Sequence, residues 1–538
     1  VGRDGSGADA GRDKRGIDIR GTITGSVNGA SDYATINIVS GDAANPTESN
    51  IYVGDANTTN NIVNDYGNVN VTNNKGSFLN NRVAKTHIVT TNGGNLTVLT
   101  KNGSIGEEIG PCADGVCTGV GTDARDLTLS INTKIQENGE GLGGTINATS
   151  TGASEVINMA SLNHNMNVDQ IKADGRVILL ADAFDPDHPE TGYGKGSAEY
   201  AVVNRLGASK DANVQPNVEG AGISIIASGD IGETGKDLTF RQTKGTFNSA
   251  YTEEGFVRQD GQQPDYISPE IYNYSPSSGV YGIDMLSNKG NINVVQLDNA
   301  DGSANDANVC AMIARDGTVN AEFSGNTYVK DVTAKNQVNL TTRGKYLIVE
   351  NMGVNEDFAY KDGDYYGTYQ TDMNPDKVNL KALDLAAVGN KNEHPHATVV
   401  VKKGTIEGQG KGREQLPNSP QDLNIVADHA YAGGYEFIMD PHTDDEQGRF
   451  TYHTNGGTDP IDLVDSEKPA SIRVTAVRPS DVDNIKNNPD SNRRIYYTGH
   501  GSVQEDKPFY DGDDEPTGDE QDQNIVVPEE EEPEEPEQ

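Results

Sequence analysis

Residues 94–129 and 222–240 share an imperfect duplicated signature. The first copy reads GNLTVLTKNGSIGEEIG and, after an insert, RDLTLS; the second reads GISIIASGDIGETGKDLTF. Each copy has a glycine, an alternating apolar strand, a turn, an Ile-Gly-Glu corner and a second strand that begins with Asp-Leu-Thr. A unit of this size cannot bury its apolar face alone, so neighbouring units must stack on it. The duplication therefore predicts a solenoid.

The composition fits a solenoid better than a set of globular domains. Only 33% of the 538 residues are hydrophobic, there is no Trp, and Gly occurs 62 times. Average globular domains are about 45–50% apolar on a count that includes Gly, whereas a stack of repeats needs only a thin apolar column. Low hydrophobicity with high charge is also typical of disorder, but the regular strand patterns argue against disorder except near the C-terminus.

Short alternating apolar runs recur along the chain, separated by Gly, Asn and Asp turns. Examples are GNVNVTNNKGSF (67–78) and NQVNLTTRGKYLIVENMG (336–353). We find no convincing long stretch with the apolar spacing of a helix, so the chain is predicted to be all-β. Antiparallel sandwiches and a parallel β-helix are the two candidate architectures. The missing Trp and the aliphatic strands favour the β-helix, in which corner Asn residues tolerate a left-handed backbone.

The expected rod has about 20 coils of roughly 20–25 residues each. At ~4.8 Å per stacked strand, its length is on the order of 100 Å. Long loops on a rigid scaffold are where binding residues usually lie. The expected organisation is a flexible lead-in at 1–16, a rod at 17–478 with insertions near 184–220, 241–285 and 355–375, and an acidic, Pro/Glu-rich linker or tail at 479–538.

The charge excludes some partners. The net charge is −40, and the last 34 residues hold 16 acidic side chains against a single lysine, Lys507. Nucleic acids and anionic lipids both require basic surfaces, so we expect neither nucleic-acid binding nor membrane insertion. The sequence contains no transmembrane run and no signal peptide. The polar start at Val1 leads us to expect a processed piece of a longer exported protein.

The corners Gly103–Gly106 and Gly229–Gly232, each followed by a strand with Leu-Thr, resemble the repeats of filamentous haemagglutinin-like exoproteins of bacterial two-partner secretion. The strand pattern over roughly residues 17–478 is similar to that family. The resemblance implies a right-handed parallel β-helix, display on the bacterial cell surface and adhesion. The NPNG- and NPNL-type signatures of the family's secretion domain are absent, which would make this chain a downstream part of the rod.

The three cysteines have different expected roles. Cys112 and Cys117 lie in PCADGVC, a loop inserted into the first signature copy, and a disulfide between them is expected in a secreted chain. Two free thiols are the alternative, since CxxxxC without nearby His is a poor zinc site. Cys310, in the apolar run ANVCAMI, is expected to be a small buried hydrophobe rather than a nucleophile.

One group of residues raises the question of catalysis. Gly499-His500-Gly501 resembles the GHG motif of polygalacturonases, which are also β-helices, and Asp444 and Asp445 lie upstream as paired carboxylates. The family's separate NTD motif and its RIK motif are missing. We therefore expect no catalytic residues and no enzymatic activity. A polygalacturonase-like activity is kept as a minor alternative, to be judged by whether Asp444, Asp445 and His500 converge in one groove.

Metal binding has weak support in the sequence. His394 and His396 in EHPHA have chelating spacing with Glu393, but no third strong ligand is recognisable, and an exposed turn is expected. Asp-rich stretches at 183–190, 298–308 and 511–515 carry oxygen ligands of the kind that Ca²⁺ prefers. None of these stretches matches a known calcium-loop pattern. No cofactor is expected, and loosely bound Ca²⁺ remains open.

Two tyrosine clusters are candidate recognition loops. Tyr offers contact area with a polar tip, which suits protein or glycan recognition, although the same residues would also pack a loop onto the rod. The clusters lie within two of the expected insertions and comprise Tyr266, Tyr272, Tyr274 and Tyr281 in the first and Tyr360, Tyr365, Tyr366 and Tyr369 in the second.

These expectations combine into a secreted, cell-surface adhesin or fibre segment. A stiff β-helical stalk would present loops to a surface protein or glycan of a host or neighbouring cell, in adhesion or in a biofilm matrix. The alternative is a self-assembling extracellular filament that pairs terminal strands or stacks end to end, suggested by the apolar Ile525–Val527 in the tail.

Overall fold

The structure is a computed structural model that describes residues 15–19, 22–25, 35–44, 48–53, 62–64, 67–80, 89–92, 94–106, 127–132, 134–135, 141–142, 144–152, 155–182, 199–207, 215–243, 282–352, 375, 377–385, 397–403, 422–427, 429–432, 435–440, 449–454 and 471–475. These residues form β-strands, turns and bends, and no helix occurs among them. The all-β prediction is confirmed for this part of the chain.

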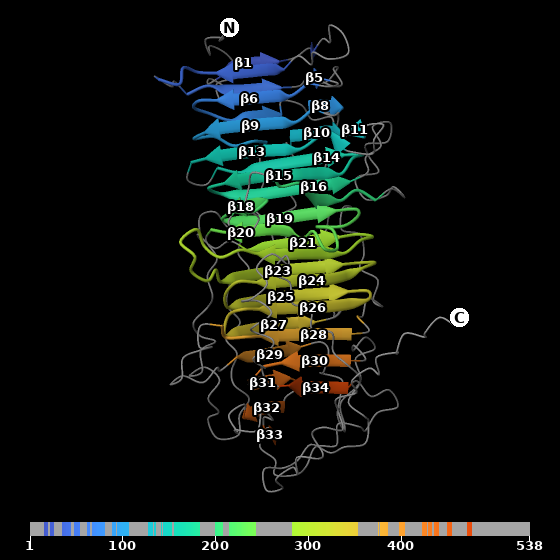
Figure 1. Cartoon of the computed structure of the whole chain (residues 1–538). Coiled ribbons are helices and arrows are strands. Elements are labelled where there is room, and N and C mark those ends of the chain that lie inside the picture. Colours follow the sequence, from blue (N-terminus) through green and yellow to red (C-terminus); the bar gives the residue numbers. More distant parts are fainter. Residues whose placement is uncertain are drawn as a thin grey trace, which may run out of the picture.

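Two long sheets, which we call sheet 1 and sheet 2, run along the molecule (Figure 1). Sheet 1 has 15 strands: β2 (Ile23–Thr24), β5 (Ile62–Asn64), β8 (Val89–Asn92), β10 (Leu127–Asn132), β14 (Ile157–Leu162), β16 (Arg176–Asp182), β19 (Gly222–Ala227), β21 (Ile283–Ser287), β23 (Ala307–Ala314), β25 (Thr327–Ala334), β27 (Tyr346–Met352), β29 (Thr398–Lys403), β31 (His429–Ala432), β32 (Tyr435–Asp440) and β33 (Arg449–Thr454).

Sheet 2 has 14 strands: β3 (Ile36–Ser40), β6 (Val69–Asn73), β9 (Leu96–Lys101), β13 (Ile146–Thr151), β15 (Met166–Ala173), β17 (Val202–Asn204), β18 (Val218–Gly220), β20 (Leu238–Gln242), β22 (Ile292–Gln296), β24 (Thr318–Phe323), β26 (Gln337–Thr342), β28 (Lys377–Ala382), β30 (Asp422–Val426) and β34 (Ser471–Thr475). A third sheet contains β1 (Arg15–Ile19), β4 (Asn50–Val53) and β7 (Phe78–Asn80), and a short hairpin contains β11 (Lys134–Ile135) and β12 (Gly141–Leu142).

The chain alternates between sheet 1 and sheet 2 as it advances. Strands of sheet 1 and sheet 2 follow each other in sequence from β21 to β31, and each pairs in parallel with the strand one coil earlier. This order is consistent with a β-solenoid. The strands are 2 to 8 residues long, and β-branched and aliphatic side chains on alternate positions suit such short, half-buried strands.

The first coils repeat every 27 residues. Ile51 pairs with Phe78, and Phe78 then bridges to Ile105, so the same side of the rod is reached at a constant spacing. Hydrogen bonds between loop residues 27 apart, such as Asn95 N to Asn68 Oδ1 at 3.0 Å, keep the turns in register. The third sheet gives these coils an extra strand, and it joins sheet 1 where Ile105 bridges to Ile157.

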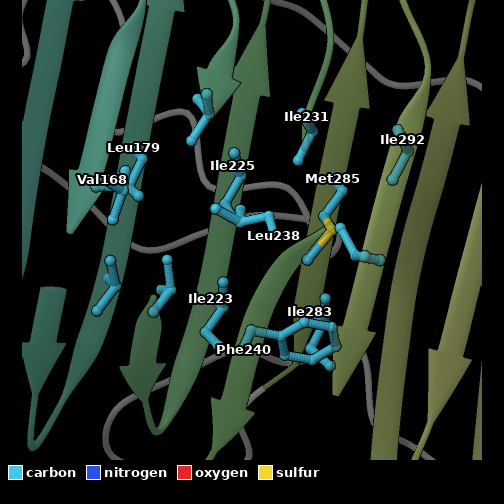
Figure 2. Close-up of a cluster of buried hydrophobic side chains, with 14 of the residues drawn as sticks. Val168, Leu179, Ile223, Ile225, Ile231, Leu238, Phe240, Ile283, Met285 and Ile292 are labelled. Atoms are coloured by element: carbon cyan, nitrogen blue, oxygen red, sulfur yellow. The ribbon is translucent and has the colours of Figure 1, made fainter. Parts of the chain in front are cut away.

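The apolar core lies between the sheets (Figure 2). Leu179, Ile225 and Met285 of sheet 1 face Leu238 and Phe240 of sheet 2, and these side chains are at most 1% exposed. Burying a side chain of this size stabilises the fold by about 1.5–3 kcal/mol relative to leaving it exposed. The core is a narrow column of aliphatic residues, which explains how so few hydrophobic residues support so long a molecule.

Burial differs between the first coils and the middle of the rod. In β3 the side chains alternate between buried and exposed, as in a sheet with one solvated face. In β16 and β19 every side chain is buried, including those that point away from the core. The outer face of sheet 1 is therefore shielded from solvent around these strands.

The corner of the duplicated signature contains one buried isoleucine and one glycine. Ile105 and Ile231 are fully buried, and each forms single-residue parallel bridges to the coils on both sides. The glycine that follows, Gly106 or Gly232, has a φ of 70° or 71°. Glycine adopts this region without steric cost, so the Ile-Gly pair turns the chain while filling the core.

The two signature copies lie at different turns of the solenoid. In the first copy the chain leaves sheet 2 through β9 and enters sheet 1 through β10. In the second copy it leaves sheet 1 through β19 and enters sheet 2 through β20. The signature therefore encodes a way of turning between sheets rather than a complete coil.

The expectation for asparagine at corners is confirmed in the described residues. Their three non-glycine residues with positive φ are Asn102, Asn163 and Asp384. Short polar side chains that hydrogen-bond locally lower the cost of this conformation.

Several boundaries differ from the expectations. Strand β1 starts at Arg15, inside the expected lead-in 1–16, and β17 and β18 lie inside the expected insertion 184–220. The ends of the range 241–285 likewise belong to β20 and β21. The described sheets contain 15 and 14 strands rather than about 20 coils, because the stretches between strands consume more chain than a 20–25-residue coil allows.

The stack is not parallel throughout, as we had expected. Strand β32 pairs antiparallel with β31, and β33 pairs antiparallel with β32. A short antiparallel meander therefore follows the last parallel strand of sheet 1, whereas sheet 2 ends with the parallel strand β34. Antiparallel neighbours need only a short connection, so the meander ends the coil without another crossover.

Candidate functional site

The predicted recognition and catalytic residues lie outside the part of the chain that the structure describes. This applies to the disulfide candidates Cys112 and Cys117, to all eight tyrosines of the two clusters, to Asp444, Asp445 and His500, and to His394 and His396. These expectations stay predictions. The expected burial of Cys310 is confirmed, since that residue is 3% exposed on β23.

The clearest polar arrangement among the described residues is an amide ladder on the outer face of sheet 2, formed by Asn293, Asn320, Asn339 and Asn379. Each asparagine is flanked by two buried core residues in the sequence pattern apolar-Asn-apolar, as in Val338 and Leu340 around Asn339. Because side chains alternate along a strand, this pattern points every asparagine outward and keeps its neighbours in the core.

Strand register brings the four amides into contact. Asn293 pairs with Asn320, Asn320 with Asn339 and Asn339 with Asn379. Each Nδ2 donates to the Oδ1 of the preceding asparagine, at 2.8, 2.6 and 2.6 Å. The Nδ2 of Asn293 donates to the carbonyl of Gly232 at 3.2 Å. The result is one continuous chain of hydrogen bonds along the rod axis, which ties four coils together.

An ionic ladder extends sheet 2 toward the N-terminal half. Glu219 lies 2.6 Å from Lys172 and 2.8 Å from Arg241, and these three residues are aligned on β15, β18 and β20. Glu219 and Arg241 are nearly buried, whereas Lys172 is 45% exposed. Arg241 also donates from Nε to the carbonyl of Asp298 at 2.7 Å, so the guanidinium links two coils.

A buried polar cluster lies on the outer face of sheet 1. Arg176 donates to the hydroxyl of Ser224 at 2.6 Å, and that hydroxyl donates to Asp284 at 3.2 Å. The Arg176 guanidinium is 3.5 Å from the same carboxylate. Burial raises the pKa of Asp284 to about 7, against the opposing attraction of Arg176. The cluster joins β16, β19 and β21 through side chains that are all shielded from water.

An apolar column runs beside this cluster on the same outer face. Register aligns Ala160, Leu180, Ile226, Leu286 and Ile313, and each is at most 5% exposed. A solvated outer face would carry polar residues at these positions. This face of sheet 1 is therefore built as an interior surface.

The Asp-rich stretch 298–308 uses its carboxylates internally. Asp298 accepts from the hydroxyl of Ser324 at 2.5 Å, and Asp301 accepts from the backbone and hydroxyl of Ser303. Asp306 accepts from the backbone of Asn326 at 2.8 Å, and burial raises the pKa of the Asp306 carboxyl. No group of three potential metal ligands occurs in the described residues.

The amide ladder was missed in the sequence because it depends on register rather than on any single motif. The signal was present: NVNV, NINV, TVNA, QVNL and KVNL all place Asn between two aliphatic residues at the start of a sheet 2 strand. A search for a recurring apolar-Asn-apolar triplet would have found more copies than the Ile-Gly-Glu corner. The Arg176–Asp284 pair offers no comparable sequence signal.

Comparisons with known proteins identify no relative. No protein-family model, no curated protein and no solved structure matches the chain. Within the described residues, nothing helical is long and apolar enough to cross a membrane.

Proposed function

We propose that the chain is part of a secreted, cell-surface adhesin or structural fibre, in which a rigid β-solenoid rod carries binding loops away from the cell. The observation that carries this proposal is the unbroken order of sheet 1, where the strands from β2 to β31 succeed one another. Stacked backbone hydrogen bonds, a continuous core and the amide ladder make such a rod stiff, as a spacer requires.

The finer architecture that we propose is a right-handed parallel β-helix. Two arguments support it: the regular alternation of the chain between two parallel sheets, and the strong preference of parallel crossover connections for the right-handed form. Parallel sheets covered by their own coils need no helices, which agrees with the strand-only character of the described residues.

The adhesive role rests on the contrast between a structural rod and long intervening segments. The acidic charge disfavours nucleic acids and anionic membranes, and leaves proteins and glycans as partner classes. The residues proposed for recognition are Tyr266, Tyr272, Tyr274, Tyr281, Tyr360, Tyr365, Tyr366 and Tyr369, and no cofactor is required for such a role.

A binding assay tests the proposal. The full chain, coupled to fluorescent beads, is applied to immobilised extracellular-matrix proteins and to a glycan array. We expect binding to at least one probe, and a loss of at least tenfold when Tyr266, Tyr272, Tyr274 and Tyr281 are changed to Ser. The matched control, Thr97→Ser on an exposed position of β9, keeps full binding. Absence of binding to every probe, or equal binding by the tyrosine variant, contradicts adhesion through these residues.

A self-assembling filament is the second candidate function. Open strand edges at the ends of a solenoid favour it, because an unpaired edge is a template for another strand. Electron microscopy of the concentrated chain distinguishes the two: long fibres of uniform width support the filament, and discrete short particles count against it. The polygalacturonase-like alternative predicts hydrolysis of polygalacturonate that is lost in His500→Ala.

A further inference from the structure

The two ends of the rod differ in shape. At the N-terminal end, β1, β2 and β3 are the outermost described strands of their sheets and belong to a single coil. At the C-terminal end, sheet 1 continues through β32 and β33, whereas sheet 2 stops at β34, one coil after β30 (Figure 1). One end is therefore level, and the other is stepped by two strands, or about 10 Å at ~4.8 Å per strand.

Exposed apolar surface gathers at the level end. The exposed large hydrophobic side chains among the described residues are Ile23 on β2, at 36%, and Val39 on β3, at 57%. The inward residues Ile36 and Ile38 also keep 9% and 7% exposure, whereas Val69 on the next strand is fully buried. In the described residues, the core is thus less completely covered at its N-terminal end than one coil further along.

The same end is nearly neutral in an otherwise acidic protein. Residues 1–44 contain five basic and six acidic side chains, a net charge of −1, against −40 for the whole chain. Like-charge repulsion opposes contact between copies of so acidic a protein over most of its surface. Repulsion between two copies is weakest where their N-terminal ends meet.

We propose that the N-terminal end, formed by β2 and β3, binds the same end of a second copy of this chain to give a closed dimer. A two-fold axis normal to β3 places the second β3 antiparallel to the first, so their backbone edges pair and the two Val39 side chains leave solvent together. Head-to-tail stacking would press this level end against the stepped end, where sheet 1 and sheet 2 cannot both pair. The contact therefore closes after two copies, and the dimer does not depend on adhesion.

Sedimentation equilibrium of the full chain tests the dimer. We expect a mass of twice 57.3 kDa at micromolar concentrations. A lysine on an edge strand blocks strand pairing, so Val39→Lys should weaken the dimer at least tenfold without changing the circular dichroism spectrum. Thr97→Lys is the control, because Thr97 is exposed on β9, two strands inside the end of sheet 2, and this variant should remain dimeric.

A distance measurement in the unmodified interface identifies which ends meet. A nitroxide carried by a bio-orthogonal side chain at residue 97 should give one intermolecular distance near 25 Å, because five strand steps of ~4.8 Å separate the two labels in the dimer. A label at Lys335, about seven coils further along, should give no distance below roughly 60 Å. A monomer at every concentration, a mass that grows without limit, or a Val39→Lys dimer as tight as the parent overturns the proposal.

Discussion

The side-chain nitrogen of Asn339 donates a 2.6 Å hydrogen bond to the side-chain oxygen of Asn320 on the neighbouring strand. Its oxygen meanwhile accepts from Asn379 at 2.6 Å and from Gln337 at 2.7 Å. Asn339 is thus the residue at which three coils and four amides meet. Ladder residues of this kind stabilise the stack through polar contacts that no apolar column supplies.

Asn339→Ala should lower the free energy of unfolding by about 1–2 kcal/mol, because three hydrogen bonds are lost and two half-buried amides are left without this partner. Hydrogen exchange measured by mass spectrometry should show faster exchange in β24, β26 and β28. The control is Asn37→Ala at the exposed first strand, where one 3.0 Å bond from Asn70 is lost, with a cost below about 0.5 kcal/mol. Equal costs for the two variants would contradict a cooperative ladder.

Gly103→Ala should be strongly destabilising. A Cβ at this position would lie 2.1 Å from the carbonyl carbon and oxygen of Gly76 in the coil below. The backbones must separate, at a cost of about 2–3 kcal/mol. Gly207→Ala is the control, because the nearest atom to its Cβ would be the Asp169 carboxylate at 3.8 Å. Thermal melting followed by circular dichroism should show a lower midpoint for the first variant alone; unchanged melting of Gly103→Ala would refute the close stacking of these turns.

Asp284 should make stability fall as pH rises from about 4 to 7. Its pKa is raised to about 7 in the folded protein, whereas the unfolded chain releases the same proton near pH 4. The folded state therefore binds more protons across this window, so raising the pH favours unfolding, by on the order of 2 kcal/mol between pH 5 and 8. The charged groups that bear on Asp284 are Arg176, Lys330 and Asp331.

Urea unfolding at pH 5 and pH 8 measures this effect. Asp284→Asn keeps a neutral side chain at both pH values, so the difference between the two midpoints should shrink relative to the parent chain. Asp316→Asn, at an exposed carboxylate paired with Lys335, should leave the difference unchanged. A pH difference in Asp284→Asn as large as in the parent chain would mean that another group is responsible.

The two glutamates Glu219 and Glu233 should respond differently to the same substitution. Glu219→Gln breaks a nearly buried pair with Arg241 and should cost about 2–4 kcal/mol. Glu233→Gln breaks a pair with Arg205 at 2.7 Å in which both side chains are more than a third exposed, and should cost less than about 1 kcal/mol. Guanidinium-free chemical denaturation, with urea at low salt, compares the two; a reversed order would contradict the burial of this ionic ladder.

Local pattern was sufficient to predict the strands and the turns. The alternation in NQVNLTTRGKYLIVENMG matches β26 and β27, and the Ile-Gly corners have the positive φ and the buried isoleucine that a tight turn between sheets needs. These features depend on neighbouring residues, so they are visible in the sequence. The 27-residue spacing of Gly-Ser-Phe at Gly76 and Gly-Ser-Ile at Gly103 was also visible and was missed.

Contacts between coils were beyond the sequence. Arg176, Ser224 and Asp284 are 48 and 60 residues apart in successive pairs, and they meet only because register aligns β16, β19 and β21. The lengths of the intervening segments decide which coils become neighbours, and no local pattern records that number. The antiparallel β32 and β33 were missed for a similar reason, since a strand's own residues do not specify the direction of its partner.

The stacked rod is the central claim, and a distance between two spin labels on sheet 2 tests it most directly. Residue 97 on β9 and residue 337 on β26 are 240 positions apart in sequence but seven strand steps apart in the sheet. At ~4.8 Å per step, with a small lateral offset, electron–electron double resonance on dilute, mixed labelled and unlabelled chain should give one narrow distribution near 35 Å. A broad distribution, or a distance beyond roughly 60 Å, would contradict a single continuous stack.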